Sequence, residues 1–291
     1  MRTSNFCHAG NIGDVWAAIP VMREFYRKTE KKIILYLKKD VPAKYYDDAN
    51  HPTKNKDGQL VSLNEKGIEM MKPLLLAQPF IEDVRIWTDE KINIDLDRIR
   101  ESDVGMPGLS INRWYFYTWP DLNCDLSEVW LYVPDTEVDY AKGKIMITRS
   151  ERYRNEKLNY EFLKPYEDEC LFCGTMREYN NFCMTYDLNI RKFHIDNFLQ
   201  LAQAIKQCKF HITNQTQAFQ LSEGQKIPRI LETCTYAPNC IPIGKNAHDT
   251  LSQYGLEYAF HELYGHGAEY IAEQEKSLLD KKKAESVVIN E

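Results

Sequence analysis

A glycine-rich segment near the start of the chain ends in a carboxylate that could act as a base. In the run from Asn5 to Asp14 (Asn-Phe-Cys-His-Ala-Gly-Asn-Ile-Gly-Asp), two glycines stand three residues apart and the acid follows directly. Glycine lets the backbone approach a ligand closely, and a carboxylate is favoured in the first turn of a helix. Asp14 could accept a proton from a substrate, or an anion could bind the N–H groups at the helix start. A plain turn capped by Asp14 fits the same residues.

Cationic side chains follow a predicted strand at residues 144–148 in the second half of the chain. They are Arg149, Arg152, Arg154 and Lys157. Open α/β sheets bind ligands at the carboxyl ends of their strands, and Arg and Lys suit phosphate oxygens. A second predicted strand, at 209–213, is followed by the polar residues Asn214, Gln215 and Thr216. The two junctions together predict a phosphate site; a solvated basic loop is the alternative.

Three short patterns could suggest a metal, but none is complete. Cys170-Leu-Phe-Cys173 lacks the second cysteine pair of a zinc site, and it also fits a buried strand. The histidines in His261-Glu-Leu-Tyr-Gly-His266 are one position too far apart for the zinc-binding helix motif. Asp95-Leu-Asp97 is a weak three-residue match that surface acids flanking a strand end explain better. We therefore predict no metal site.

Composition limits the classes of protein. The 291 residues, 43% of them hydrophobic, suit one large or two medium domains. The net charge of −6 argues against stable nucleic-acid binding. No targeting segment and no apolar run of about 20 residues is visible, and eight irregularly spaced cysteines fit reduced thiols. We expect a cytoplasmic protein without a transmembrane segment; peripheral contact with a membrane stays open.

Strand and helix patterns alternate along both halves of the chain. Expected strands lie at 2–6, 32–37, 81–87, 91–96, 144–148, 169–173, 209–213 and 227–231, and expected helices at 15–28, 64–76, 196–207, 218–223 and 269–286. This alternation predicts an α/β fold with parallel sheets. Residues 105–121, rich in Gly, Pro and aromatics, show no strong periodicity and could form an acceptor-binding loop region or pack aromatic side chains under a helix. The polar segment 134–144 suggests domains at 1–137 and 138–265, with 266–291 a terminal helix that packs back on the first domain.

Four segments, in order, resemble the heptosyltransferase-like (glycosyltransferase family 9-type) family of inverting glycosyltransferases. They are Gly13-Asp14…Pro20, Thr148-Arg149-Ser…Lys157, Gly174…Glu178, and the run from Ile212 to Leu221. The resemblance implies the GT-B fold, in which two Rossmann-like domains face a central cleft. It also implies a bacterial or phage enzyme that moves a sugar from a nucleotide-diphosphate donor to a glycan or other hydroxyl acceptor, without a metal or another cofactor.

The resemblance also implies a role for each segment. Asp14 would be the general base, and its loop, with His8, Gly10, Asn11 and Gly13, would face the acceptor. The donor diphosphate would contact Arg149, Arg152, Lys157, Asn214, Gln215 and Thr216, and the donor nucleoside Gly174, Glu178 and Glu232. An inverting transfer needs one base at the acceptor oxygen and compensation for a leaving diphosphate, and cations can supply the latter.

The chain departs from the family pattern at one place. The usual Asp-Thr-Gly is Gln215-Thr216-Gln217 here, and the usual His is Gln220. These substitutions favour a non-catalytic nucleotide-sugar- or glycan-binding protein on the same fold. A GT-B-type nucleotide-sugar epimerase is the other alternative.

Overall fold

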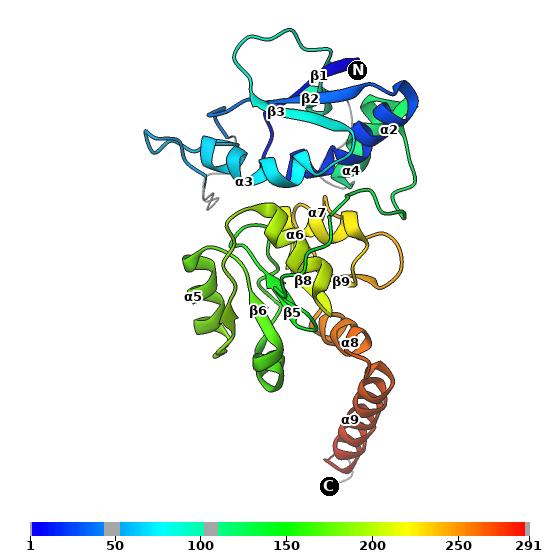
Figure 1. Ribbon diagram of the computed structural model, residues 1–291. Coiled ribbons are helices and arrows are strands. Elements are labelled where there is room, and N and C mark those ends of the chain that lie inside the picture. Colours follow the sequence, from blue (N-terminus) through cyan, green and yellow to red (C-terminus); the bar gives the residue numbers. More distant parts are fainter. Residues whose placement is uncertain (1, 44–52, 102–109, 289–291) are drawn as a thin grey trace.

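The computed structural model describes residues 2–43, 53–101 and 110–288, apart from the side chains of 280–288. The chain builds two parallel sheets one after the other, each with its own helices (Figure 1). The α/β fold class predicted from the sequence is confirmed.

The first sheet has the strand order β3-β2-β1-β4, and all its pairings are parallel. Its elements are β1 (Thr3–His8), α1 (Ile12–Ala17), α2 (Ile19–Thr29), β2 (Lys32–Leu37), α3 (Glu65–Leu76), β3 (Ile81–Ile86), β4 (Ile94–Asp95), the 3₁₀ helix η1 (Leu96–Arg100), α4 (Ile111–Thr118) and the 3₁₀ helix η2 (Pro120–Leu122). Because β1, β2 and β3 run parallel, the loop after β1 lies at the carboxyl edge of the sheet.

The second sheet has the order β10-β9-β8-β5-β6-β7 and is also parallel throughout. Its elements are β5 (Ile145–Thr148), η3 (Glu161–Glu169), β6 (Cys170–Phe172), α5 (Met176–Thr185), β7 (Arg191–Lys192), α6 (Phe198–Gln207), β8 (Phe210–Asn214), α7 (Gln217–Gln225), β9 (Arg229–Glu232), β10 (Ala247–Thr250), α8 (Gln253–Tyr264) and α9 (Gly267–Val288). The central strands β5, β8 and β9 are buried along their whole length, as expected for a sheet covered on both faces.

One hydrophobic core contains residues from both halves of the chain, the half that forms the first sheet and the half that forms the second. Helix α1 of the first half packs against α7 of the second, and α3 packs against α6. The fully buried Trp16 marks the contact, because its ring lies 6.1 Å from that of Phe198 and its indole N–H donates to Gln217 Oε1 at 3.2 Å. The loop after β1 is thereby held against the second half.

One predicted helix is divided in the structure. The sequence predicted a single helix at 15–28, but α1 ends at Ala17 and α2 begins at Ile19. Pro20 lies in the first turn of α2. Since proline has no N–H to donate to the carbonyl of Trp16 and its ring crowds that carbonyl, it ends the first helix. The short α1 that results carries Asp14.

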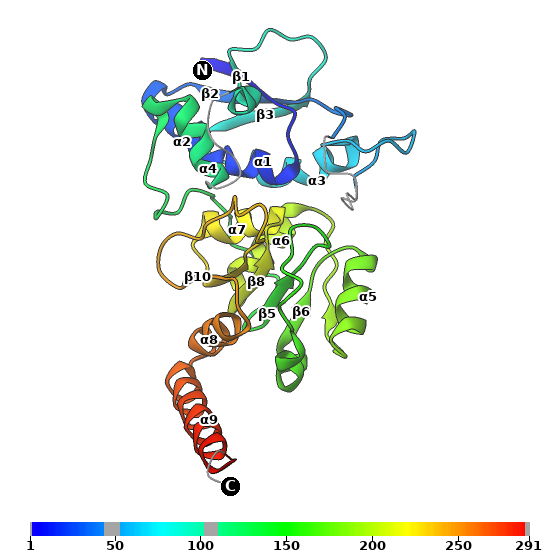
Figure 2. The same ribbon diagram turned by 180° about the vertical axis from the view of Figure 1, so that it is seen from behind.

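The described part of the aromatic segment, residues 110–121, includes α4, in which burial of Trp114 and Tyr115 outweighs the weak helix propensity of an aromatic run; residues 105–109 lie outside the described part. Two further expectations need correction. Helix α6 begins at Phe198 and not at residue 196, because Asn197 caps it: its Oδ1 accepts from Gln200 N at 3.0 Å. Helix α9 lies against α8 and points away from the first sheet (Figures 1 and 2), so it does not pack back on the first domain.

His211 makes the stability of the second sheet depend on pH. This fully buried residue of β8 lies between Thr148 Oγ1, 2.8 Å from Nε2, and Ser222 Oγ, 2.9 Å from Nδ1. Burial, together with the charge of Arg229, lowers the pKa of His211 from 6.5 to about 3. Between these values the unfolded chain binds a proton that the folded protein does not, so stability is lost as the pH falls.

We expect the free energy of unfolding to fall by up to about 1.4 kcal/mol per pH unit below about pH 6 through this residue. Urea unfolding at several pH values would measure the slope. His211→Gln is expected to lower the plateau near neutral pH and to flatten the acid slope by that amount. Equal slopes for the variant and the wild-type protein would contradict this assignment.

Candidate functional site

A cavity of about 650 Å³ is lined by residues of both halves. The first half contributes the loop and first turn at Asn11–Asp14, together with side chains from α3, η1 and α4. The second half contributes the segments that follow β5, β6, β7 and β8. The cavity therefore lies between the carboxyl ends of the second sheet's strands and the loop after β1.

The cavity is more basic than the protein as a whole. Among the described residues its lining includes five cationic side chains and two carboxylates: Lys66, Arg100, Arg149, Arg152 and Lys192, with Asp14 and Glu178. The whole chain carries a net charge of −6. An excess of cations in a recess of an acidic protein concentrates anionic ligands there.

Asp14 is the only carboxylate that the described part of the first half contributes to the cavity. It stands at the third position of α1, where its Oδ2 accepts from Asn11 N at 3.1 Å in a capping box. The same oxygen lies 2.5 Å from Nη2 of Arg100. Capping of α1 and a role as base are therefore compatible, because both contacts use one oxygen and leave Oδ1 without a partner among the described residues.

A buried chain of hydrogen bonds lies beneath the Asp14 loop. His8 is fully buried, its Nδ1 accepts from Gly10 N at 2.8 Å, and its Nε2 lies 2.7 Å from the Tyr115 hydroxyl. That hydroxyl donates to the backbone oxygen of Asp14 at 2.9 Å. His8 is absent from the cavity lining, so it supports the loop from below and does not face the cavity.

The two glycines of the loop have different surroundings, which gives a matched pair of variants. A Cβ on Gly10 would lie 2.6 Å from His8 Cε1 and 2.7 Å from Asp14 Oδ2, whereas one on Gly13 would meet only Gln217 atoms, at 3.6 Å or more. His8 cannot withdraw without breaking its bond to Tyr115. We expect Gly10→Ala to lower the free energy of unfolding by about 1–3 kcal/mol.

Gly13→Ala is expected to be neutral or slightly stabilising, because alanine is favoured over glycine in a helix by about 1 kcal/mol. Urea unfolding of the two variants beside the wild-type protein measures the contrast. Equal stability of the two variants would contradict the tight packing described for Gly10.

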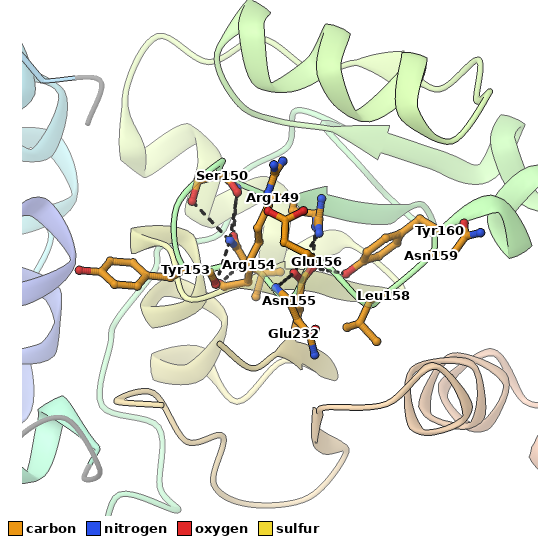
Figure 3. Close-up of polar contacts among 12 residues, drawn as sticks. Arg149, Ser150, Tyr153, Arg154, Asn155, Glu156, Leu158, Asn159, Tyr160 and Glu232 are labelled. Atoms are coloured by element: carbon orange, nitrogen blue, oxygen red, sulfur yellow. Dashed lines mark hydrogen bonds and ion pairs between the residues drawn. The ribbon is translucent and has the colours of Figure 1, made fainter. Parts of the chain in front are cut away.

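Arg149 is held by a buried carboxylate. Its Nε and Nη2 donate to the two oxygens of Glu232 at 2.6 and 3.0 Å, and Asn155 N and the Tyr160 hydroxyl donate to the same carboxylate at 2.5 and 2.6 Å (Figure 3). Burial would lower the pKa of the Arg149 guanidinium, but the charge of Glu232 outweighs it and the net shift is upward. Arg149 is a fixed cation in the cavity wall.

Three residues expected at the donor are not among those that line the cavity. Glu232 is fully buried and occupied by Arg149 and its neighbours. Asn214 is fully buried, and its side chain binds the loop after β5, accepting from Ser150 N at 3.0 Å and donating to Arg152 O at 2.7 Å. Lys157 is exposed on a turn. Glu232 and Asn214 therefore shape the loop that carries Arg149 and Arg152, and they do so from beneath it.

The glutamines that depart from the family pattern bind other parts of the protein. Gln215 lines the cavity, but its amide donates to Ala237 O and Asn239 Oδ1 and accepts from Cys234 N. Gln217 accepts from Trp16, and Gln220 Oε1 accepts from Asn112 Nδ2 at 3.2 Å. Gln217 and Gln220 thus connect α7 to the first half of the chain. Thr216 caps α7 at the cavity wall.

Gly174 and Glu178 come together beside Lys192. Glu178 Oε2 accepts from Thr175 N and Oγ1 at 2.7 and 2.9 Å in the capping box of α5. A Cβ on Gly174 would lie 2.9 Å from the Phe172 ring, and Lys192 Nζ donates to Gly174 O at 2.5 Å. The predicted nucleoside contacts Gly174 and Glu178 both line the cavity.

Sequence analysis missed three of the five cations, Lys66, Arg100 and Lys192. Lys192 ends β7, and its place at a strand end was the available signal. Lys66 in α3 and Arg100 in η1 belong to no motif. Only the fold brings these two side chains to the cavity.

The described residues hold no group of three or more His, Cys, Asp or Glu arranged to bind a metal. All eight cysteines are free thiols in the structure. No helix among the described residues is long and apolar enough to cross a membrane.

Comparison with known proteins identifies the fold. No protein-family model matches the sequence, and no curated protein matches it. Several solved structures resemble it over most of its length, among them the following three. The first is an ADP-heptose lipopolysaccharide heptosyltransferase II from E. coli, at 11% sequence identity and a TM-score of 0.58, with 94% of this chain and 99% of that chain covered. The second is a glycosyl transferase family 9 protein from Veillonella parvula, at 8% identity and a TM-score of 0.52, with 89% of each chain covered. The third is the dodecameric, iron-containing heptosyltransferase TibC in complex with ADP-D-β-D-heptose, at 12% identity and a TM-score of 0.50, with 86% of this chain and 63% of that chain covered.

The chain has the GT-B fold of these structures, which confirms the fold that the sequence motifs predicted. At 8–12% identity the likeness concerns the fold alone. One fold carries many functions, so the function of this protein depends on the residues of its cavity.

Proposed function

We propose that the protein is an inverting, metal-independent glycosyltransferase that uses a nucleotide-diphosphate sugar. The observation that carries the proposal is the cavity itself. The carboxylate of Asp14, whose Oδ1 has no partner among the described residues, shares the cavity with the fixed cation Arg149 and the neighbouring Arg152. A base on one side and cations on the other are what transfer from a diphosphate leaving group requires.

The proposed reaction follows from these positions. Asp14 Oδ1 takes the proton of an acceptor hydroxyl, and the acceptor oxygen forms a bond to the anomeric carbon of the donor sugar. The bond from that carbon to the diphosphate oxygen breaks on the opposite face, so the configuration inverts. Arg149 and Arg152 compensate the charge of the nucleoside diphosphate that leaves, without a metal.

The donor side is proposed in more detail from the lining of the second half. Gly174 and Glu178 would meet the nucleoside, and Gln215 and Thr216, which directly precede α7, would meet the diphosphate or the sugar. Two of the similar structures are named for ADP-heptose, which makes heptosyl or hexosyl donors the first to test. A glycan or another hydroxyl compound would be the acceptor.

The test is a transfer assay with a panel of nucleotide sugars and hydroxyl acceptors. Release of nucleoside diphosphate that depends on acceptor is expected, and proton NMR of the product is expected to show the anomer opposite to that of the donor. A retained anomer would contradict the mechanism. Conversion of a donor into an isomeric nucleotide sugar without any acceptor would identify an epimerase instead.

A second function, non-catalytic binding of a nucleotide sugar or glycan, is favoured by one observation. The amide of Gln215, which stands where the family has a carboxylate, is occupied by Ala237, Asn239 and Cys234. Saturable binding of a nucleotide sugar with neither transfer nor hydrolysis over the same panel would support this function.

A further inference from the structure

Arg100 is the closest cation to Asp14 among the described residues. It is the last residue of η1, the 3₁₀ helix that follows β4, and its Nη2 lies 2.5 Å from Asp14 Oδ2. The Asp14 side chain is 11% exposed and the Arg100 side chain 49%. A nearly buried carboxylate is thus paired with a cation that reaches it from the open part of the cavity.

The pair restricts the Asp14 carboxylate to one orientation. Asp14 Oδ2 accepts hydrogen bonds from both Arg100 Nη2 and Asn11 N. Gly10 packs so closely beside this oxygen that a Cβ at position 10 would not fit. A partial rotation of the carboxylate would break both contacts, and a half-turn only exchanges two equivalent oxygens. Oδ1 is the oxygen that remains for a substrate.

The other charged and titratable groups around this pair do not replace Arg100. Tyr115 and Asp97 act on its guanidinium more weakly than Asp14 does, and the charge of Asp14 raises the pKa of Arg100. Asp97 is occupied by Ala9 N, with Lys38 Nζ 3.7 Å away. Burial, and to a smaller extent the charge of Asp14, raises the pKa of the Cys240 thiol in the second half, and a thiol cannot supply a positive charge. Arg100 is therefore the counter-charge that fixes Asp14.

We propose that Arg100 is a positioning residue for the general base: it binds Asp14 Oδ2 so that Oδ1 is presented to the acceptor hydroxyl. The inference rests on the proposed function. It predicts that Arg100 acts on the rate of transfer through Asp14, and that it contributes little to donor binding, which belongs to the second half of the chain. Lysine can restore the charge but not the planar fork of the guanidinium.

The test compares Arg100→Gln, Arg100→Lys and Arg98→Gln. Arg98 is the matched control, because it lies on the same 3₁₀ helix, carries the same charge and is placed over the Trp119 ring, outside the cavity lining. We expect Arg100→Gln to lower kcat by about 10–100-fold, as loss of a positioning contact does, with the donor Kd from calorimetry unchanged. Arg100→Lys is expected to recover part of kcat, and Arg98→Gln to match the wild-type protein.

The last measurement compares kcat of the Asp14→Asn variant with kcat of the double variant that also carries Arg100→Gln. If Arg100 acts through Asp14, adding Arg100→Gln to Asp14→Asn lowers kcat far less than it does alone, since residues acting as a unit are not additive. An unchanged kcat in Arg100→Gln, or a donor Kd that weakens in step with kcat, would overturn this inference. Absence of transfer by the wild-type protein would instead contradict the proposed function.

Discussion

Asp14→Asn is expected to lower the rate of sugar transfer by about 10²–10⁴-fold, the usual contribution of a general base. An amide cannot take the acceptor proton, but it keeps the size of the carboxylate and can still accept from Asn11 N. The donor should therefore bind as before. Steady-state kcat and calorimetric donor binding, measured on one preparation, separate the two effects.

Asp135→Asn serves as the control for Asp14→Asn. Its side chain is 95% exposed, it pairs with Lys206, and it does not line the cavity. We expect wild-type transfer from it. Near wild-type turnover by Asp14→Asn would show that another group takes the acceptor proton, and it would contradict the role of Asp14 as general base.

Glu232→Gln should destabilise the protein more than any change to an exposed ion pair in the loop after β5, which Glu232 supports from beneath. Arg149 and Glu232 have side chains 6% and 0% exposed, and removing one charge of such a pair leaves the other buried and uncompensated, at a cost of about 3–5 kcal/mol. Nucleotide-diphosphate binding should weaken as well, because Arg149 loses the carboxylate that fixes it. Urea unfolding and calorimetry measure the two effects.

The control for Glu232→Gln is Glu156→Gln. Glu156 Oε1 lies 2.6 Å from Arg154 Nε, a distance equal to that from Arg149 Nε to Glu232, but the Glu156 side chain is 72% exposed. Exposed pairs contribute about 0–1 kcal/mol, so this variant should unfold almost as the wild-type protein does. A similarly small loss for Glu232→Gln would refute the claim that the cavity wall depends on a buried ion pair.

Much of the fold could be predicted because its signals are local. The apolar runs of β2 and β5 and the alternation of strands with helices identify parallel α/β sheets without tertiary information. The division between α1 and α2 also had a local signal, Pro20, which the periodicity at 15–28 concealed. Helix α4 had none, since it depends on burial of Trp114 and Tyr115 against the rest of the protein.

The candidate site was predictable only where its residues follow strands. Asp14, Arg149, Gln215 and Glu178 all come after strand ends, where the rule for open sheets places ligands. Residue type alone could not tell a ligand contact from a support beneath it. Glu232 is such a support, and its role became visible only when β9 placed it under Arg149.

Arg100 shows the limit of motif reading most clearly. It lies 86 residues from Asp14 in the sequence, on a 3₁₀ helix without a recognisable pattern. Contacts of this kind depend on the register of β1 with β4, and no spacing in the sequence encodes them. The glutamines at 217 and 220 are similar, because their partners Trp16 and Asn112 belong to the other half of the chain.

The central claim, that the cavity binds a nucleotide-diphosphate sugar through its cations, is tested most directly by calorimetric titration with ADP, GDP, UDP and dTDP and their sugars. We expect one-to-one binding of at least one of them, about tenfold weaker in Arg152→Gln, as for the loss of one charge-assisted contact. Arg154→Gln, on the same loop but outside the cavity lining, should bind like the wild-type protein. No binding of any of these compounds, or equal binding by both variants, would contradict the account.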